Sequence, residues 1–323
     1  MNIIKTLKQK IFCGGLLNAR DVLQLETAPL AELCSAADEI RAYFCGKDFD
    51  MCTIINGKCG QCSEDCKYCA QSARYNTVCA ESYPLLSTAE LMAQAKHNAA
   101  QGVLRYSIVT SGKRLSEKEV EQACESISAI HKEVDIQICV SFGLLEEKQF
   151  AKLRKAGVSR AHCNLEASER YFPNVCTTHT WQDKVETLKA AKSAGMSICS
   201  GGIMGLGESM KDRVDLVLAV RELGVKSIPV NLLNPISGTP YENNQVLTND
   251  EICRIIAMFR FIIPDGAIRL AGGRLLLPDK GARCFRSGAN AAISGDMLTT
   301  AGHTVQTDMK LIEKLGYEVK LGR

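Results

Sequence analysis

Hydrophobic and polar positions follow two alternating patterns along this chain. Short apolar or alternating runs, typical of strands, are followed by longer amphipathic runs that begin with helix-capping residues and end near glycine. This rhythm repeats eight times. The predicted strands are 52–56, 104–110, 135–142, 159–166, 196–204, 227–233, 267–271 and 289–294.

Local signals mark where the helices between these strands begin and end. Three segments have the spacing of a capping box, in which a hydroxyl and a carboxylate satisfy each other's backbone N–H groups: Ser87-x-x-Glu90, Ser116-x-x-Glu119 and Thr248-x-x-Glu251. Glycines stand where helix C-caps are expected, at Gly102, Gly157, Gly195 and Gly224.

Eight β/α units over about 250 residues predict a (β/α)8 barrel of the TIM type. The rival is a doubly wound open sheet, but no G-x-G-x-x-G follows the first strand. We predict that residues 1–50 form a short N-terminal helical extension. We predict that residues 51–323 form the barrel domain with a C-terminal tail, without a linker between the two parts. In such a barrel, functional residues lie at the C-terminal ends of the strands.

Composition narrows the class of protein. The 323 residues are 46% apolar, and 39 Lys and Arg nearly balance 36 Asp and Glu, so no strong attraction to nucleic acid or a membrane surface is expected. Neither a secretory signal nor an apolar run of membrane-spanning length is apparent, which predicts a cytoplasmic protein. Sixteen cysteines are unusual in that reducing compartment, where they indicate metal or redox chemistry rather than disulfides.

Four of these cysteines crowd into the segment KCGQCSEDCKYCAQS, directly after the first predicted strand. A structural zinc site, or a non-catalytic iron–sulfur carrier, would need Cys59 as a fourth ligand. The two C-x-x-C pairs also permit redox chemistry. The third interpretation is an iron–sulfur cluster on Cys62, Cys66 and Cys69, which would leave one iron open, as in catalytic metal sites.

The spacing C-x-x-x-C-x-x-C, with Tyr68 before the last cysteine, resembles the signature of the radical S-adenosylmethionine (SAM) superfamily. The resemblance implies a [4Fe–4S] cluster that binds SAM and generates a 5′-deoxyadenosyl radical. Within that superfamily the chain resembles the biotin synthase family, and the matching segments are CSEDCKYCAQSARYNT, CSGGIMGLGES, IPVNLLNPISGTP, IRLAGGR and GANAAISGDMLTTAG. A hydrogenase-maturation protein is the alternative, against which these long matches weigh.

The biotin synthase resemblance implies sulfur insertion into dethiobiotin, with the sulfur taken from an auxiliary iron–sulfur cluster. Alternation along the strands predicts that Cys139, Cys199 and Arg269 point into the barrel. In the family, three cysteines and an arginine hold the auxiliary cluster. Ser107 stands where the family has its third cysteine. Either Ser107 replaces it, or another cysteine does, or the cluster is larger than [2Fe–2S]. Cys163 and Cys176 are the candidate cysteines, and alternation along the strand counts against Cys163.

The resemblance also implies which residues bind the small molecules. Asn164 and Glu166 take the places of the asparagine and acid that bind the SAM ribose, and Tyr68 and Ile203 belong to the same cofactor site. Asn231 matches the asparagine that binds the ureido ring of dethiobiotin, with Asn164 nearby. A homodimer and an electron donor such as flavodoxin or ferredoxin are implied as partners. Cys52, Cys79 and Cys284 receive no role.

Overall fold

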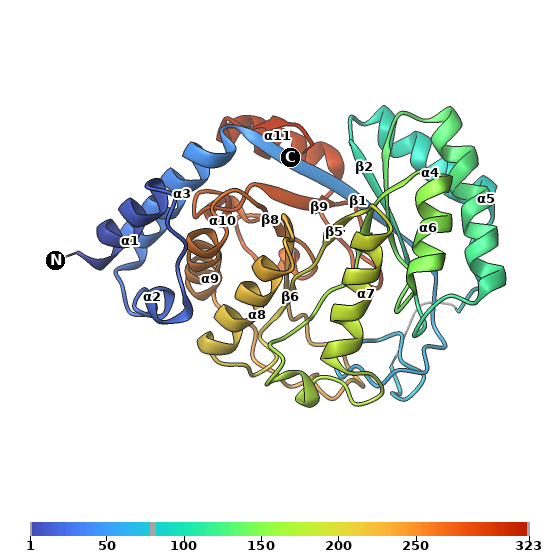
Figure 1. The fold of residues 1–323 in the computed structure, drawn as a ribbon, viewed down its shortest axis with the longest axis horizontal. Helices are drawn as coiled ribbons and strands as arrows, with labels where there is room; N and C mark the ends of the chain where they lie inside the picture. Colours follow the sequence, from blue (N-terminus) through green and yellow to red (C-terminus); the bar gives the residue numbers. More distant parts are fainter. Residues whose placement is uncertain (1, 78–81, 322–323) are drawn as a thin grey trace.

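The protein, described here by a computed structural model over residues 2–77 and 82–321, is a closed barrel of parallel strands inside a layer of helices (Figure 1). Its strands are β1 Asp48–Lys58, β2 Arg105–Thr110, β3 Gln137–Ser141, β4 Val158–His162, β5 Ser197–Cys199, β6 Gly202–Met204, β7 Ser227–Leu232, β8 Ala267–Leu270, β9 Ala291–Ser294 and β10 Glu318–Val319. Each of β1 to β4 pairs with the next strand, and β5 and β6 both pair with β7. β7 pairs with β8, β8 with β9, and β9 with β1, which closes the barrel. The predicted TIM-type barrel is therefore confirmed.

The fifth position of the barrel is filled by two short strands instead of the single predicted strand 196–204. β5 and β6 are separated by Ser200 and Gly201. A Cβ atom on Gly201 would lie 1.9 Å from the carbonyl oxygen of Pro229 on β7. The backbone of the break therefore approaches the neighbouring strand so closely that only glycine fits.

Helices cover the outside of the barrel and extend it at the N-terminus. They are α1 Ile3–Phe12, α2 Ala19–Leu23, α3 Leu30–Cys45, α4 Thr88–Ala100, α5 Glu117–Glu133, α6 Glu147–Ala156, α7 Trp181–Ser193, α8 Met210–Glu222, α9 Asn249–Ile262, α10 Ala282–Phe285 and α11 Val305–Leu315. Helices α1–α3 precede β1 and lie together at the left of Figure 1, where they pack against α8 and α9.

The predicted helix caps are present. The three capping boxes begin α4, α5 and α9, with both hydrogen bonds formed in each. Two further boxes, at the starts of α7 and α8, use aspartate in place of glutamate: Thr180 with Asp183, and Ser209 with Asp212. All four predicted C-cap glycines have positive φ, from +76° to +116°. Local chemistry therefore fixes where these helices begin and end.

The two faces of the strands differ as alternation predicts. On β3, Ile138 and Val140 are buried in the hydrophobic core under the helices, whereas Cys139 and Ser141 line the inside of the barrel. No helix in the described ranges is long and apolar enough to cross a membrane. The polar inner face of the barrel is where a site is expected.

Candidate functional site

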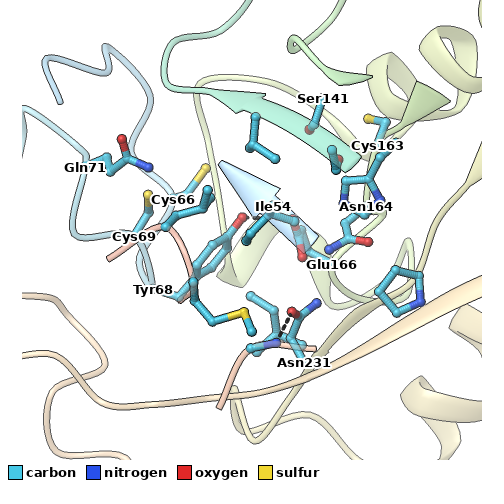
Figure 2. Close-up of a pocket in the computed structure, with 18 of the residues that line it drawn as sticks. Ile54, Cys66, Tyr68, Cys69, Gln71, Ser141, Cys163, Asn164, Glu166 and Asn231 are labelled. Carbon is cyan, nitrogen blue, oxygen red and sulfur yellow. Dashed lines mark hydrogen bonds between the residues drawn. The ribbon is translucent and has the colours of Figure 1, made fainter. Parts of the chain in front are cut away.

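A cavity of about 400 Å³ occupies the barrel interior and continues among the loops that follow the C-terminal ends of the strands. In Figure 2, Cys66 and Cys69 enter it from the loop after β1, and Asn164 and Glu166 enter it from the opposite side, after β4. Ile54 of β1 lies between these two groups. The cavity has a mouth built from loops and a floor built from strand residues.

The loop after β1 holds three thiols toward the mouth of the cavity. Cys62, Cys66 and Cys69 are half-buried and line it. The backbone around them is fixed by hydrogen bonds from Cys62 N to Gln71 O (3.1 Å), from Ala73 N to Cys62 O (2.8 Å) and from Cys69 N to Cys66 O (3.0 Å). Thiolates are the usual ligands of iron–sulfur clusters, so this donor set fits a cluster with one iron left open to the cavity.

The other cysteines of uncertain role lie elsewhere. Cys59 is buried and pairs through its backbone with Tyr83, outside the cavity lining. It therefore does not complete a four-thiolate site facing the cavity. The Sγ atom of Cys284 in α10 lies 3.9 Å from that of Cys253 in α9, within the packed core. Cys79 lies outside the described residues.

Cys176, the candidate replacement ligand for the auxiliary cluster, lies beside the loop cysteines. Its Sγ is 3.7 Å from Cys66 Sγ and 3.3 Å from His179 Nδ1, and His179 Nδ1 is 2.6 Å from Glu64 Oε2. Cys66, Cys176 and His179 could together hold a metal ion. His179 was not predicted as a site residue, although the spacing Cys-x-x-His in the loop after β4 is a usable signal.

These contacts shift the acidity of the two thiols in opposite directions. Its hydrogen bond to Cys176, and then burial, raise the pKa of the Cys66 thiol well above its ordinary value. The hydrogen bond from Cys66 is the largest influence on Cys176 and, although burial opposes it, lowers the pKa of Cys176 to about 4, with a smaller contribution from His179. Without metal, the Cys176 thiolate therefore lies beside His179 together with the Glu64 carboxylate. A metal bound at Cys66 would displace the thiol proton.

Glu166 lies opposite the thiols in a left-handed backbone conformation, with φ +68°. Tyr68 Oη donates a hydrogen bond to Glu166 Oε1 at 3.0 Å. Burial and the Glu166 charge raise the pKa of Tyr68 well above its ordinary value, so this phenol stays protonated. The second carboxylate oxygen, Oε2, is buried without a hydrogen-bond partner among the described residues. Glu166 can therefore accept a hydrogen bond from a ligand in the cavity.

The segment after β5 meets the segment after β4 beside this carboxylate. Asn164 Oδ1 accepts a hydrogen bond from Gly201 N at 3.0 Å, which leaves the amide N–H groups of Asn164 for the cavity. A Cβ on Gly202 would lie 2.4 Å from Glu166 O. Glycine is therefore required here for close contact between neighbouring backbones. Ile203 lines the same wall.

Asn231 of β7 is held by its neighbours on both sides. Its Oδ1 accepts from Gly272 N at 2.9 Å and its Nδ2 donates to Gly202 O at 3.2 Å. The side chain lines the cavity, as predicted from alternation along β7. One N–H of its amide remains for a ligand.

The floor of the cavity brings together the residues predicted to face inward. Cys139, Cys199, Arg269 and Ser107 all line it, and the Ser107 hydroxyl is hydrogen-bonded to Cys139. Cys52 of β1 lines it as well, with its Sγ 3.2 Å from Arg269 Nη1. No role was predicted for Cys52, although alternation along β1 places it on the same face as Ile54, which also lines the cavity.

Buried charges lie directly beneath these thiols. Asp50 Oδ1 is 3.0 Å from Arg269 Nη2, and Asp50 Oδ2 is 3.6 Å from Arg160 Nη1. Burial opposes ionisation of Asp50, but Arg269, Arg160 and Arg105 together lower its pKa to about 2. Three buried guanidinium groups thus converge on one carboxylate. This arrangement favours an anionic occupant above them.

The floor thiols also differ in acidity. Burial and the neighbouring Cys199 raise the pKa of Cys139 to about 11. Burial acts against ionisation of Cys199 too, but His162 and the arginines beneath lower its pKa to about 7. Positive charge close to a buried thiol stabilises its thiolate form, and thiolates are the usual ligands of iron–sulfur clusters. The floor of the cavity therefore fits a second iron–sulfur cluster.

Known structures share the fold of this barrel. The chain superposes on methylornithine synthase with a TM-score of 0.84 at 19% identity, covering 97% of each chain. It superposes on the FeFe-hydrogenase maturase of Carboxydothermus hydrogenoformans with a TM-score of 0.83 at 18% identity, covering 98% of this chain and 79% of the other. At such identities the likeness shows the shared fold alone.

Sequence comparison is more specific. Residues 59–220 match the Radical SAM superfamily and residues 229–318 match the Biotin and Thiamin Synthesis associated domain. The chain is 54% identical over 315 residues to the biotin synthase of Brachyspira hyodysenteriae, covering 98% of this chain and 94% of that protein. It is 53% identical over 321 residues to the biotin synthase of Akkermansia muciniphila, covering 99% and 100%. The chain therefore belongs to the biotin synthase family of radical SAM enzymes.

Proposed function

We propose that this enzyme converts dethiobiotin to biotin by inserting sulfur between two unactivated carbons. The observation that supports it best is that a single cavity connects two separate sets of thiols. Cys62, Cys66 and Cys69 lie at its mouth, and Cys139 and Cys199 lie at its floor. A substrate between them would have a radical source on one side and a sulfur source on the other.

In this proposal Cys62, Cys66 and Cys69 hold a [4Fe–4S] cluster, and Cys139, Cys199 and Arg269 hold an auxiliary iron–sulfur cluster. When bound, these clusters together with SAM supply the hydrogen-abstracting radical and the sulfur that this chemistry requires. The contribution of the chain is to position the reactants and to exclude water from the barrel.

The residues of the wall bind the two small molecules. Glu166 Oε2 accepts a hydrogen bond from the SAM ribose, while Tyr68 holds the other carboxylate oxygen. The free N–H of Asn164 and the backbone beside Ile203 complete the cofactor site. Asn231 directs its remaining N–H to the ureido carbonyl of dethiobiotin, in an orientation fixed by its bonds to two neighbouring backbones.

The same proposal includes partners and setting that the family resemblance implies. An electron donor such as flavodoxin or ferredoxin would reduce the loop cluster. A second copy of the chain would form a homodimer, and the enzyme would work in the cytoplasm. Size measurement in solution and reduction by purified flavodoxin would test the first two points directly.

The central test compares two cysteine variants of the anaerobically reconstituted enzyme. Cys66→Ala should abolish 5′-deoxyadenosine and biotin formation, both measured by mass spectrometry. Cys59→Ala is the matched control, because Cys59 lies in the same segment but outside the cavity lining, and it should retain both products. Near-parental cleavage of SAM by Cys66→Ala would overturn the proposal, and loss of bound iron in Cys59→Ala would favour a four-thiolate carrier instead.

A further inference from the structure

The inner face of the barrel is built in rings of four side chains from alternate strands, as in other TIM-type barrels. Strand pairing defines which residues share a ring. Cys52 of β1 pairs with Arg105 of β2, and Arg105 pairs with Gln137 of β3. Because the strands are tilted, the β3 side chain at the same level along the barrel axis as Cys52 is two residues beyond Gln137, at Cys139. Repeating this step over β5 and β8 and back to β1 yields a closed ring of Cys52, Cys139, Cys199 and Arg269.

The closure of this ring checks its assignment. Four steps of two residues return to Cys52, which corresponds to the shear of eight of a TIM-type barrel. The direct contact between Cys52 Sγ and Arg269 Nη1, at 3.2 Å, joins the first and last members. All four side chains are buried and line the cavity. One ring therefore carries three thiols and one guanidinium.

We infer that Cys52 is the third thiolate ligand of the auxiliary iron–sulfur cluster. It takes over the role of the family cysteine whose position is occupied by Ser107 in this chain. The inference rests on the proposed function, since it presumes a cluster at the cavity floor. The proposed ligand therefore comes from β1, whereas the family cysteine position, Ser107, is on β2. Each thiol releases its proton when it binds iron, and no other bond changes.

Ser107 is less suited to this role by chemistry, although its ring is adjacent to that of Cys52. The same pairing rule places it in the next ring toward the mouth, and the members of that ring are Ser107, His162, Pro229 and Ile293. Its hydroxyl is engaged with Cys139. A serine oxygen is also a harder ligand than a thiolate, which soft iron–sulfur centres prefer.

Charge supports the assignment independently. Arg105, Arg160 and Arg269 face a single carboxylate, Asp50, beneath the ring. Buried positive charge in excess is costly unless an anion lies nearby. Three thiolates on a cluster supply such negative charge at the level of the ring, and Arg269 is already in contact with one of the thiols.

The test uses ⁵⁷Fe-reconstituted protein in which Cys62, Cys66 and Cys69 are all alanine, so that only the auxiliary site holds iron. Into this background we would introduce Cys52→Ser, Cys52→Ala, Ser107→Ala and Cys176→Ala. Iron per chain and the Mössbauer spectrum are measured for each, and circular dichroism verifies the fold. In both Cys52 variants the iron bound per chain should fall by about tenfold or more. In Ser107→Ala and Cys176→Ala it should stay at the level of the background protein.

A swap variant, Cys52→Ser with Ser107→Cys, separates ligation from structural effects. It returns a thiol to the adjacent strand, and should regain iron that Cys52→Ser alone loses. Unchanged iron and an unchanged spectrum in both Cys52 variants would overturn the inference and leave the proposed function intact. A background protein without iron would overturn the auxiliary cluster itself, and the role of Cys52 with it.

Discussion

The backbone of Glu166 is strained at the candidate site. A non-glycine residue with φ +68° is strained by about 1–2 kcal/mol. Backbone hydrogen bonds hold it there, from Glu166 N to Gly201 O and from Ile203 N to Glu166 O. This conformation places the carboxylate beside Tyr68 at the cavity wall. The strain is thus tied to the orientation of one functional side chain.

Replacing Glu166 by glutamine tests whether its charge matters. Glu166→Gln keeps the shape and the backbone but removes the negative charge that would accept hydrogen bonds from ribose hydroxyls. SAM affinity should fall about tenfold, since charged hydrogen bonds contribute about 1.5–3 kcal/mol. Equilibrium binding of SAM to reconstituted enzyme measures this. Glu169→Gln, an exposed acid in the same loop, is the control, and equal affinities in the two variants would remove Glu166 from the cofactor site.

At the scale of elements, α8 is tied to the loop after β4 by one buried carboxylate. Asp212 Oδ1 accepts from Ser168 Oγ at 2.8 Å and from Arg170 Nε at 3.0 Å, and Oδ2 accepts from Ser209 N at 3.0 Å. Although burial opposes ionisation, these bonds lower the pKa of Asp212 to about 2. The cap of α8 therefore also anchors the loop that carries Glu166.

This carboxylate predicts a pH dependence of stability. Because its pKa is lowered on folding, Asp212 stabilises the protein above its ordinary pKa of 3.8, and this contribution is lost as the pH falls toward 2. Asp212→Asn should lower the free energy of unfolding by about 1–3 kcal/mol at pH 6. The difference from the parent should shrink near pH 3, as measured by urea unfolding at both pH values.

The control for that prediction lies on the same helix. Asp215 pairs with Lys211 at the surface, 2.5 Å away, and its replacement by asparagine should cost less than about 1 kcal/mol. A pH-independent difference between Asp212→Asn and the parent would contradict the ionic role of Asp212.

The elements and the inward-facing residues were predictable because their causes are local. Period-two alternation placed Cys139 inward, and capping boxes gave the helix starts. The break at Gly201 was not predictable, since it depends on the position of Pro229 on another strand. For the same reason the sequence did not reveal that Cys52 contacts Arg269 or that Cys176 contacts Cys66. Such contacts depend on register and loop packing.

At the scale of the whole molecule, the floor of the cavity joins parts of the chain that are far apart in sequence. The ring takes one side chain each from β1, β3, β5 and β8. Arg269 of β8 already contacts β1 through Cys52 and through Asp50 beneath the ring. A cluster bound by three of these side chains would link the strands across the barrel interior, where backbone pairing does not reach.

Iron loading of the floor should therefore stabilise the entire barrel. In the variant lacking Cys62, Cys66 and Cys69, anaerobic loading should raise the unfolding temperature by about 5 °C or more, because a ligand that binds only the folded state stabilises it. Thermal circular dichroism of loaded and unloaded protein measures the shift. When Ser107→Ala is added to the same background, iron loading should raise the unfolding temperature by the full amount. When Cys52→Ala is added instead, the unfolding temperature should hardly change. Equal increases in these two variants would mean that the cross-link does not include β1.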